Sequence, residues 1–337
     1  MEFTIQAKTY AECADFLKLV FDGQEYTLSE FSAAFKRKEF DLDQMLPQCE
    51  ILYRGQKKKF EEYLMERREL AKRLAFFTRC RDVVQPIEIN LAIGDPEYYQ
   101  AAKFLEKAET CLQTARYYFI KSTDILEYDC CVHWQAGYLT IYGIRSMNFS
   151  TAIIWYNNCF DYIIQVAFLA FSLYRGIKRY SENLTFEEIL KMCTYNALKT
   201  LHNNEPDNVG LTNLWNIIEE CRVSRQDLND WANYFKHKGG LGFIGLKPEF
   251  PVQVFVGNPN GDFKSRISEF EAITLDMDCC IEKVVSAHEA LIKCLHRLMD
   301  FINFPAGQCS INSEGKFVLP DKNTYRKVRL EKLNNPT

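Results

Sequence analysis

The residues of this chain that could do chemistry together are an asparagine, a lysine and a histidine near one glycine pair. The stretch "DLNDWANYFKHKGG" runs from Asp227 to Gly240 and contains Asn233, Lys236 and His237. A histidine can transfer protons near neutral pH, and a lysine can stabilise a developing negative charge. The same pattern also predicts a simple helix end, so the chemistry depends on the elements that position these side chains.

The pattern of the stretch is that of an amphipathic helix. At about 3.6 residues per turn, one face holds the apolar residues and is expected to face the core, namely Leu228, Trp231, Ala232 and Phe235. The opposite face holds Asp230, Asn233 and His237, and Lys236 lies between the two faces. We expect Gly239 or Gly240 to end the helix in a left-handed conformation. Because cations are favoured at a helix C-terminus, an ordinary solvated helix end explains these residues equally well.

A second polar series lies in the most apolar part of the chain, between Ser150 and Tyr174. Asn157, Asp161 and Gln165 recur there every four residues, so a helix places them on one face. Buried polar groups need hydrogen-bond partners. If this helix packs antiparallel to the Trp231 helix, Asp161 could face His237 or Lys236 and hold the histidine tautomer. The alternative is a structural polar network that fixes the register of the helices.

The motif "WANYFKHKGG" at the end of an expected core helix resembles the HEPN superfamily, and in particular the group named after a Clostridium thermocellum protein. The resemblance covers about residues 135–305 and depends on the Asn-x-x-Lys-His pattern and on the helical order. It implies a helical bundle, a homodimer, and work on RNA in a prokaryotic RNA-targeting, defence or toxin–antitoxin setting. The first 130 residues carry no resemblance.

HEPN ribonucleases pair an arginine with a histidine four to six residues later and cleave RNA without a metal. Asn233 and His237 match the pattern, but Ala232 stands where the arginine would precede the asparagine. The nearest upstream arginine is Arg225, and Lys236 could replace the cation only in part. A charged phosphorane would then be poorly stabilised. The departure favours a binding role over vigorous cleavage.

Composition limits the other function classes. The 337 residues are 47% hydrophobic with a formal net charge of -4, so no global field favours nucleic acid. The thirteen cysteines form no CxxC pair, which indicates free thiols in a reducing cytoplasm. The apolar segment is interrupted by polar groups, so we expect no membrane association. No sequence motif for a metal or cofactor is present, and we expect neither.

The expected fold is all-α: a HEPN-like helical bundle with an N-terminal helical hairpin and a small β-hairpin insertion. We expect an N-terminal helical region at 1–130, the bundle at 131–305 and a polar basic tail at 306–337. The helices of the hairpin should cover Gln56–Arg81 and about 95–119, with Asp95 as N-cap, and should pack antiparallel. The run "KPEFPVQVFVGNPNGDF", 247–263, predicts the β-hairpin.

Other expected elements complete the bundle. They are an apolar helix over about 147–174, a capping box at Thr185–Glu188 and a last helix over about 275–304 that carries the core histidine His288.

Three functions remain open on these grounds. The first is a non-catalytic or weakly catalytic binding and assembly module, with RNA as a possible ligand and a homodimer as the expected state. The second is a metal-independent endoribonuclease that uses His237, Asn233 and Lys236 with support from Asp161. The third is a scaffold that binds another protein.

Overall fold

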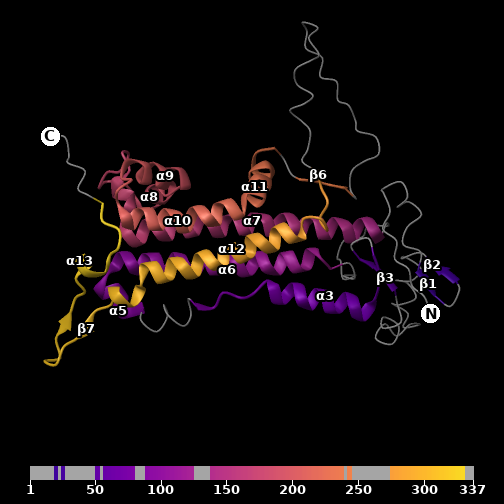
Figure 1. Ribbon diagram of the computed structural model, residues 1–337, viewed down its shortest axis with the longest axis horizontal. Helices are drawn as coiled ribbons and strands as arrows, with labels where there is room; N and C mark the ends of the chain where they lie inside the picture. The colour runs from indigo at the N-terminus through magenta and orange to yellow at the C-terminus, as the bar shows by residue number, and fades with distance from the viewer. Residues whose placement is uncertain are drawn as a thin grey trace, which may run out of the picture. The chain divides into compact units, whose positions relative to one another are not determined.

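The protein is mostly helical, as predicted. The computed structural model describes residues 19–21, 24–26, 50–53, 56–79, 88–124, 137–238, 241–244 and 274–330 (Figure 1). The longest helices there are α6 (Pro96–Ser122), α7 (Gly137–Phe171), α10 (Val209–Ser224) and α12 (Ile281–Ile302). The strands in this part of the chain have two to four residues and form two-stranded pairs. The all-α fold class is therefore confirmed.

Shorter helices connect these rods. They are α3 (Phe60–Arg73), α5 (Glu88–Gly94), α8 (Phe186–Met192), α9 (Tyr195–Asn204), α11 (Gln226–Lys238) and α13 (Lys322–Tyr325), with 3-10 turns η3 (Leu173–Gly176) and η6 (Phe304–Gly307). The antiparallel strand pairs are β1 (Leu19–Phe21) with β2 (Gln24–Tyr26), β3 (Glu50–Tyr53) with β4 (Gln56–Lys59), and β7 (Ser310–Ile311) with β8 (Phe317–Val318). The pair β5 (Gly242–Phe243) and β6 (Thr274–Leu275) is parallel.

The chain forms two compact units, each built from three segments. The first unit contains Met1–Leu74, Tyr117–Ile153 and Asn229–Glu282. The second contains Ala75–Arg116, Ile154–Leu228 and Lys283–Thr337. Helices α6, α7, α11 and α12 each contribute one part to each unit. The domain boundaries expected near residues 130 and 305 stay a prediction.

In the first unit, α3 packs antiparallel to the end of α6. The Tyr63 hydroxyl donates to Asp124 at 3.2 Å, and Arg67, one turn further along α3, donates to the carbonyl of Ile120 at 3.3 Å. Arg67 also forms a 2.7 Å ion pair with Asp124. The predicted antiparallel hairpin is therefore present, although its first helix is shorter than the predicted 56–81 at both ends. It begins later because residues 56–59 form β4, and it ends at Arg73, after which residues 74–78 are not helical.

In the second unit, α6, α7, α10 and α12 build one apolar core (Figure 1). Ring contacts join α6 to α7 and α7 to α12, and Cys294 of α12 donates to the carbonyl of Ile217 of α10 at 3.7 Å. Residues 137–171 form one helix, which begins ten residues earlier than the predicted start at 147. Because residues four apart lie on one face of an α-helix, α7 places Asn157, Asp161 and Gln165 on the same face.

The helix starts that the sequence marks with capping residues are confirmed. Asp95 accepts hydrogen bonds from the backbone N–H groups of Glu97 and Tyr98, and Pro96 is the first residue of α6. Thr185 and Glu188 form the reciprocal capping box of α8. The predicted β-hairpin at 247–263 lies outside the described residues, as do residues 331–337 of the tail.

The described part of the predicted tail is anchored to the start of α6. Arg326 donates to both carboxylate oxygens of Asp95, at 3.0 and 2.9 Å, and to Glu97 at 2.5 Å, while the Tyr325 hydroxyl also donates to Asp95. Burial alone would raise the pKa of Asp95, but the Tyr325 hydrogen bond and the Arg326 charge outweigh it and lower that pKa. This segment is thus part of the folded second unit.

Among the described residues, no helix combines the length and the apolar character that crossing a bilayer requires.

Candidate functional site

Helix α11 buries one face and exposes the other, as its residue pattern predicts. Leu228, Trp231 and Ala232 are buried, and Phe235 is half-buried. In the first unit, the Trp231 ring lies 6.2 Å from the ring of Phe149 on α7, measured between centroids. Because the buried face is fixed by this packing, the polar face of α11 must point away from the core.

The polar end of α11 is a small exposed cluster. Asn233, Lys236 and His237 are all exposed, and their spacing of three and four residues makes them neighbours on the helix surface. Within the described ranges, none of the three side chains has a hydrogen bond or an ion pair. The cluster is therefore open to a ligand. Gly239 and Gly240, which we expected to end the helix, lie outside the described residues.

Position 232 cannot supply a cation to this cluster. Ala232 is 0% exposed, so its side chain lies in the packed face of α11 rather than beside His237. An arginine placed there would have to bury its charge or displace the core, both of which are costly. Alanine at this position thus agrees with the local packing.

Asp161 belongs to the other unit of the protein. It lies on the second half of α7 and is exposed, and Asn157, one turn earlier, donates to it at 3.4 Å. His237 and Lys236 are in the first unit. The expected pairing of Asp161 with His237 therefore stays a prediction.

The polar series on α7 has a partner that the sequence did not indicate. Arg225, the residue after α10, is buried and donates through both terminal nitrogens to the Asn157 oxygen at 3.4 Å. Its guanidinium also lies 3.9 Å from the centre of the Phe160 ring. Burial lowers the pKa of Arg225, while nearby thiols and Asp161 act in the opposite direction. Arg225 and Asn157 therefore join α10 to α7, as the structural interpretation of this series predicts.

Gln165, the third member of the series, differs from Asn157. Its side-chain oxygen is buried and has no hydrogen-bond partner among the described residues. The Nε atom of Arg225 is in the same condition. Within the polar series, Asn157 thus both donates and accepts hydrogen bonds, whereas the Gln165 oxygen has no partner among the described residues.

His288 is a buried histidine with both ring nitrogens engaged. Its Nε2 lies 2.9 Å from the carbonyl of Ala75, and its Nδ1 lies 3.0 Å from the Tyr156 hydroxyl. Because a carbonyl can only accept, Nε2 carries the proton and Nδ1 accepts from Tyr156. Burial lowers the pKa of His288 to about 4. The expectation of a satisfied core histidine is confirmed.

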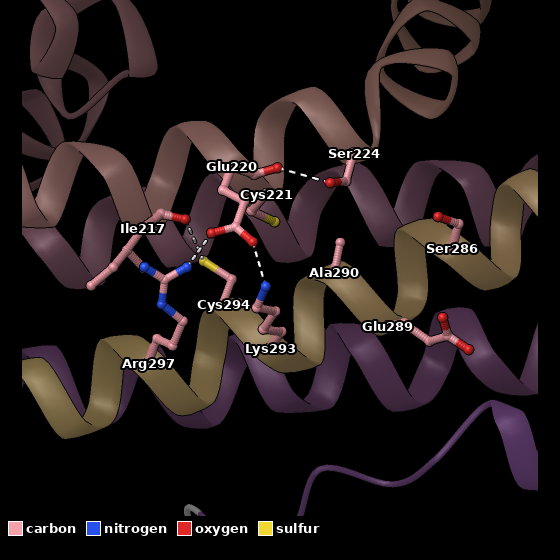
Figure 2. A pocket seen from close by; sticks show the side chains of 10 residues that line it. All are labelled: Ile217, Glu220, Cys221, Ser224, Ser286, Glu289, Ala290, Lys293, Cys294 and Arg297. Carbon is pink, nitrogen blue, oxygen red and sulfur yellow. Dashed lines mark hydrogen bonds and ion pairs between the residues drawn. The ribbon is translucent and has the colours of Figure 1, made fainter.

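A pocket of about 220 Å³ lies between α10 and α12 in the second unit (Figure 2). Figure 2 shows the Glu220 carboxylate between the side chains of Lys293 and Arg297, with which it forms ion pairs. Cys221 and Cys294 also line it. A hydrogen bond with Cys221, together with burial, raises the pKa of Cys294 well above its ordinary value. A thiol whose pKa is raised in this way is a poor nucleophile, so Cys294 is not an activated cysteine.

The amino-acid sequence alone gives no signal for this pocket. Lys293 and Arg297 are one turn apart on α12, which the sequence does predict. Their partner Glu220 is on α10, more than seventy residues earlier, and no local pattern joins the two helices. The same holds for Arg225 and Asn157, which are 68 residues apart.

Comparisons with protein-family models, with curated proteins and with solved structures found no match to this chain.

Proposed function

We propose that the chain is a non-catalytic or weakly catalytic HEPN-like binding and assembly module that contacts RNA through Asn233, Lys236 and His237. One observation carries the proposal: these three side chains form an exposed cluster at the end of an otherwise packed helix and have no hydrogen-bond or ion-pair partner among the described residues. A lysine can bind a phosphate, and an asparagine and a histidine can donate hydrogen bonds to RNA. The prokaryotic RNA-targeting, defence or toxin–antitoxin setting comes from the resemblance alone.

Two further observations support weak or absent catalysis. The side chain at position 232 is buried alanine, so the cation of the HEPN ribonucleases is missing where the motif would put it. The nearest upstream arginine, Arg225, is 2% exposed and bonded to Asn157. A buried guanidinium with a structural partner cannot reach a phosphorane on the surface, so transition-state stabilisation would fall to Lys236.

The expected RNA affinity is modest. A helix C-terminus carries roughly half a negative charge, which reduces the positive field that a phosphate meets beside Lys236. Single-stranded RNA releases counterions with a slope of about -0.7 per phosphate contact in a plot of log affinity against log salt. With one or two contacts, we expect a total slope between about -0.7 and -1.4.

The test measures binding of a labelled single-stranded RNA by fluorescence anisotropy over a range of salt concentrations. Lys236→Gln should weaken binding at low salt and reduce the magnitude of the salt slope by about 0.7. The matched control is Lys199→Gln, which removes another exposed lysine, from α9, and should leave both quantities unchanged. Equal effects of the two variants, or no RNA binding at all, would refute the RNA contact and favour the protein-binding scaffold.

The alternative function is a metal-independent endoribonuclease, which the exposure of His237 beside Lys236 favours. In this case the histidine would transfer the 2'-OH proton and the lysine would stabilise the phosphorane. The purified chain should then cut RNA in the presence of EDTA, and His237→Ala should abolish the cutting. If RNA is bound but stays intact in EDTA, the binding module is the better description.

A further inference from the structure

A hairpin in the second unit exposes an unusual number of large apolar side chains. Strands β7 and β8 pair Ile311 with Phe317, so these two side chains share one face of the ribbon, and Leu319 follows on that face by the period of two. These three residues are between 62% and 64% exposed. Exposed apolar side chains grouped in this way mark interaction surfaces.

The turn of this hairpin holds the side chains in place. Asn312 accepts hydrogen bonds from the backbone N–H groups of Glu314 and Lys316, at 3.0 and 2.9 Å. Gly315 has a φ of 75°, which glycine adopts without strain. A turn fixed in this way loses little conformational entropy when its side chains meet a partner.

Helix α5 adds two exposed isoleucines to the same end of the unit. Ile89 and Ile93 are 76% and 48% exposed and lie one turn apart on α5. The residue before β7, Cys309, donates its backbone N–H to the carbonyl of Asn90 at 3.1 Å, so α5 lies beside the base of the hairpin (Figure 1). We call the surface formed by Ile89, Ile93, Ile311, Phe317 and Leu319 the apolar end.

We propose that the apolar end binds the apolar end of a second copy of this chain. Charge favours this occupant: Glu314 and Lys316, 2.9 Å apart in an ion pair, are the charged residues of 310–319, so the hairpin has no net charge. In a two-fold contact every pairing between the copies occurs twice, so Lys316 of each copy can meet Glu314 of the other. A neutral apolar surface therefore meets itself without repulsion.

The backbone of the hairpin favours the same occupant. Within the described residues, β7 and β8 form a two-stranded sheet whose outer edges pair with no further strand. An unpaired edge is a template for another strand, and a hairpin of the same sequence offers a matching edge. The inference deepens the assembly role in the proposed function and depends on it, but it does not need the RNA contact at α11.

The size of the apolar end predicts a reversible dimer. Five side chains with this exposure present on the order of 400 Å² of apolar surface. A standard interface buries about 800 Å² on each partner, so the contact falls among the weak and transient ones. We therefore expect dissociation in the micromolar range, roughly 1 to 100 µM.

The experiment is analytical ultracentrifugation of the full chain from about 1 µM to about 200 µM, which spans that range. Wild type should shift from monomer to dimer, and Phe317→Asp should stay monomeric throughout because a carboxylate would be buried in the contact. Val209→Asp is the matched control, since it puts the same charge on a residue that is 73% exposed at the first position of α10. This variant should dimerise like wild type.

The other outcomes overturn the proposal. A wild-type chain that is monomeric at every concentration, or a dimer that survives Phe317→Asp, would exclude the apolar end as the contact between copies. Co-sedimentation of the wild-type monomer with vesicles of phosphatidylserine and phosphatidylcholine would assign the surface to a lipid instead. Circular dichroism shows whether Phe317→Asp is folded, and Ile311→Asp is a second variant at the paired strand position.

The anisotropy assay separates this inference from the proposed function. If Phe317→Asp binds RNA with the salt slope of wild type while the dimer is lost, both proposals hold. A chain that dimerises through the apolar end but binds no RNA keeps this inference and refutes the RNA contact.

Discussion

Two histidines show how differently this chain uses the same side chain. His288 on α12 is 0% exposed, and both its ring nitrogens are engaged, by Ala75 and Tyr156. His237 on α11 is exposed and has no hydrogen-bond partner in the described part of the chain. The buried imidazole is a structural element of the second unit. The exposed imidazole is available to a ligand.

The same contrast separates the buried polar network of α7 and α10 from the end of α11. Arg225 donates to Asn157 within the core, whereas Asn233 and Lys236 end at the surface. Burial makes a polar group costly unless the fold supplies its partners, so buried groups contribute to stability. Exposed groups contribute little to stability and can bind other molecules. Substitutions in the buried network should therefore change the free energy of unfolding, whereas substitutions at the end of α11 should change the binding of other molecules.

The largest effect is expected at Arg225. Arg225→Ala leaves a cavity beside Phe160 and a buried Asn157 oxygen without its donor. We expect the free energy of unfolding to fall by about 4 kcal/mol. Arg225→Met fills the volume without burying a charge, so it should lower the free energy of unfolding by only about 1 kcal/mol. Urea unfolding followed by circular dichroism measures both, and equal losses would assign the guanidinium charge a role that packing does not explain.

Acidification should act on the buried histidine. In the folded chain the pKa of His288 is lowered from 6.5 to about 4. As the pH falls through this window, the unfolded chain binds a proton that the folded chain does not bind, so stability is lost progressively. The loss should reach about 3 kcal/mol at the lower end of the window.

The control for this prediction is His288→Gln, which keeps a neutral donor and acceptor but cannot be protonated. Its unfolding free energy, measured by urea titration at each pH, should be nearly constant between pH 6.5 and 4. Below that window both proteins should lose stability together, because Asp95 and Glu97 have lowered pKa values and are protonated there. A wild-type slope in the variant would show that another group carries the acid response.

A smaller effect of opposite sign is expected at Gln165. Its buried oxygen has no partner in the described residues, so Gln165→Leu removes an unsatisfied group. We expect the free energy of unfolding to rise by about 1 kcal/mol. Asn157→Leu on the same helix should lower it, because Arg225 would lose its acceptor. The thermal midpoints of the two variants test the difference, and a loss at both positions would contradict it.

The smallest effect on stability is expected at His237. Because the side chain is exposed, His237→Ala should change the free energy of unfolding by less than about 0.5 kcal/mol. The same variant should weaken RNA binding in the anisotropy assay if the end of α11 is a binding surface. If His237→Ala destabilised the protein as much as Arg225→Ala is predicted to, His237 would have a structural role, and its contrast with His288 would be refuted.

Local patterns predicted the elements of this protein well. Capping residues marked the starts of α6 and α8, and the apolar face of α11 followed from its spacing. These features depend only on residues within one or two helical turns of each other, so a short stretch of sequence is enough to predict them. The predicted start of the first hairpin helix, at Gln56, was wrong because residues 56–59 pair with 50–53 as strands. Pairing between strands overrides local helix propensity here.

The sequence by itself determined that the chain is helical, where several helices begin, and which face of α11 is polar, because these depend on backbone geometry and side-chain periodicity. Only the tertiary structure decided that Arg225 meets Asn157, that Glu220 lies between Lys293 and Arg297, and that the apolar end stays exposed. Such contacts join residues far apart in the chain. Their partners are chosen by the packing of whole helices, which no short stretch of sequence contains.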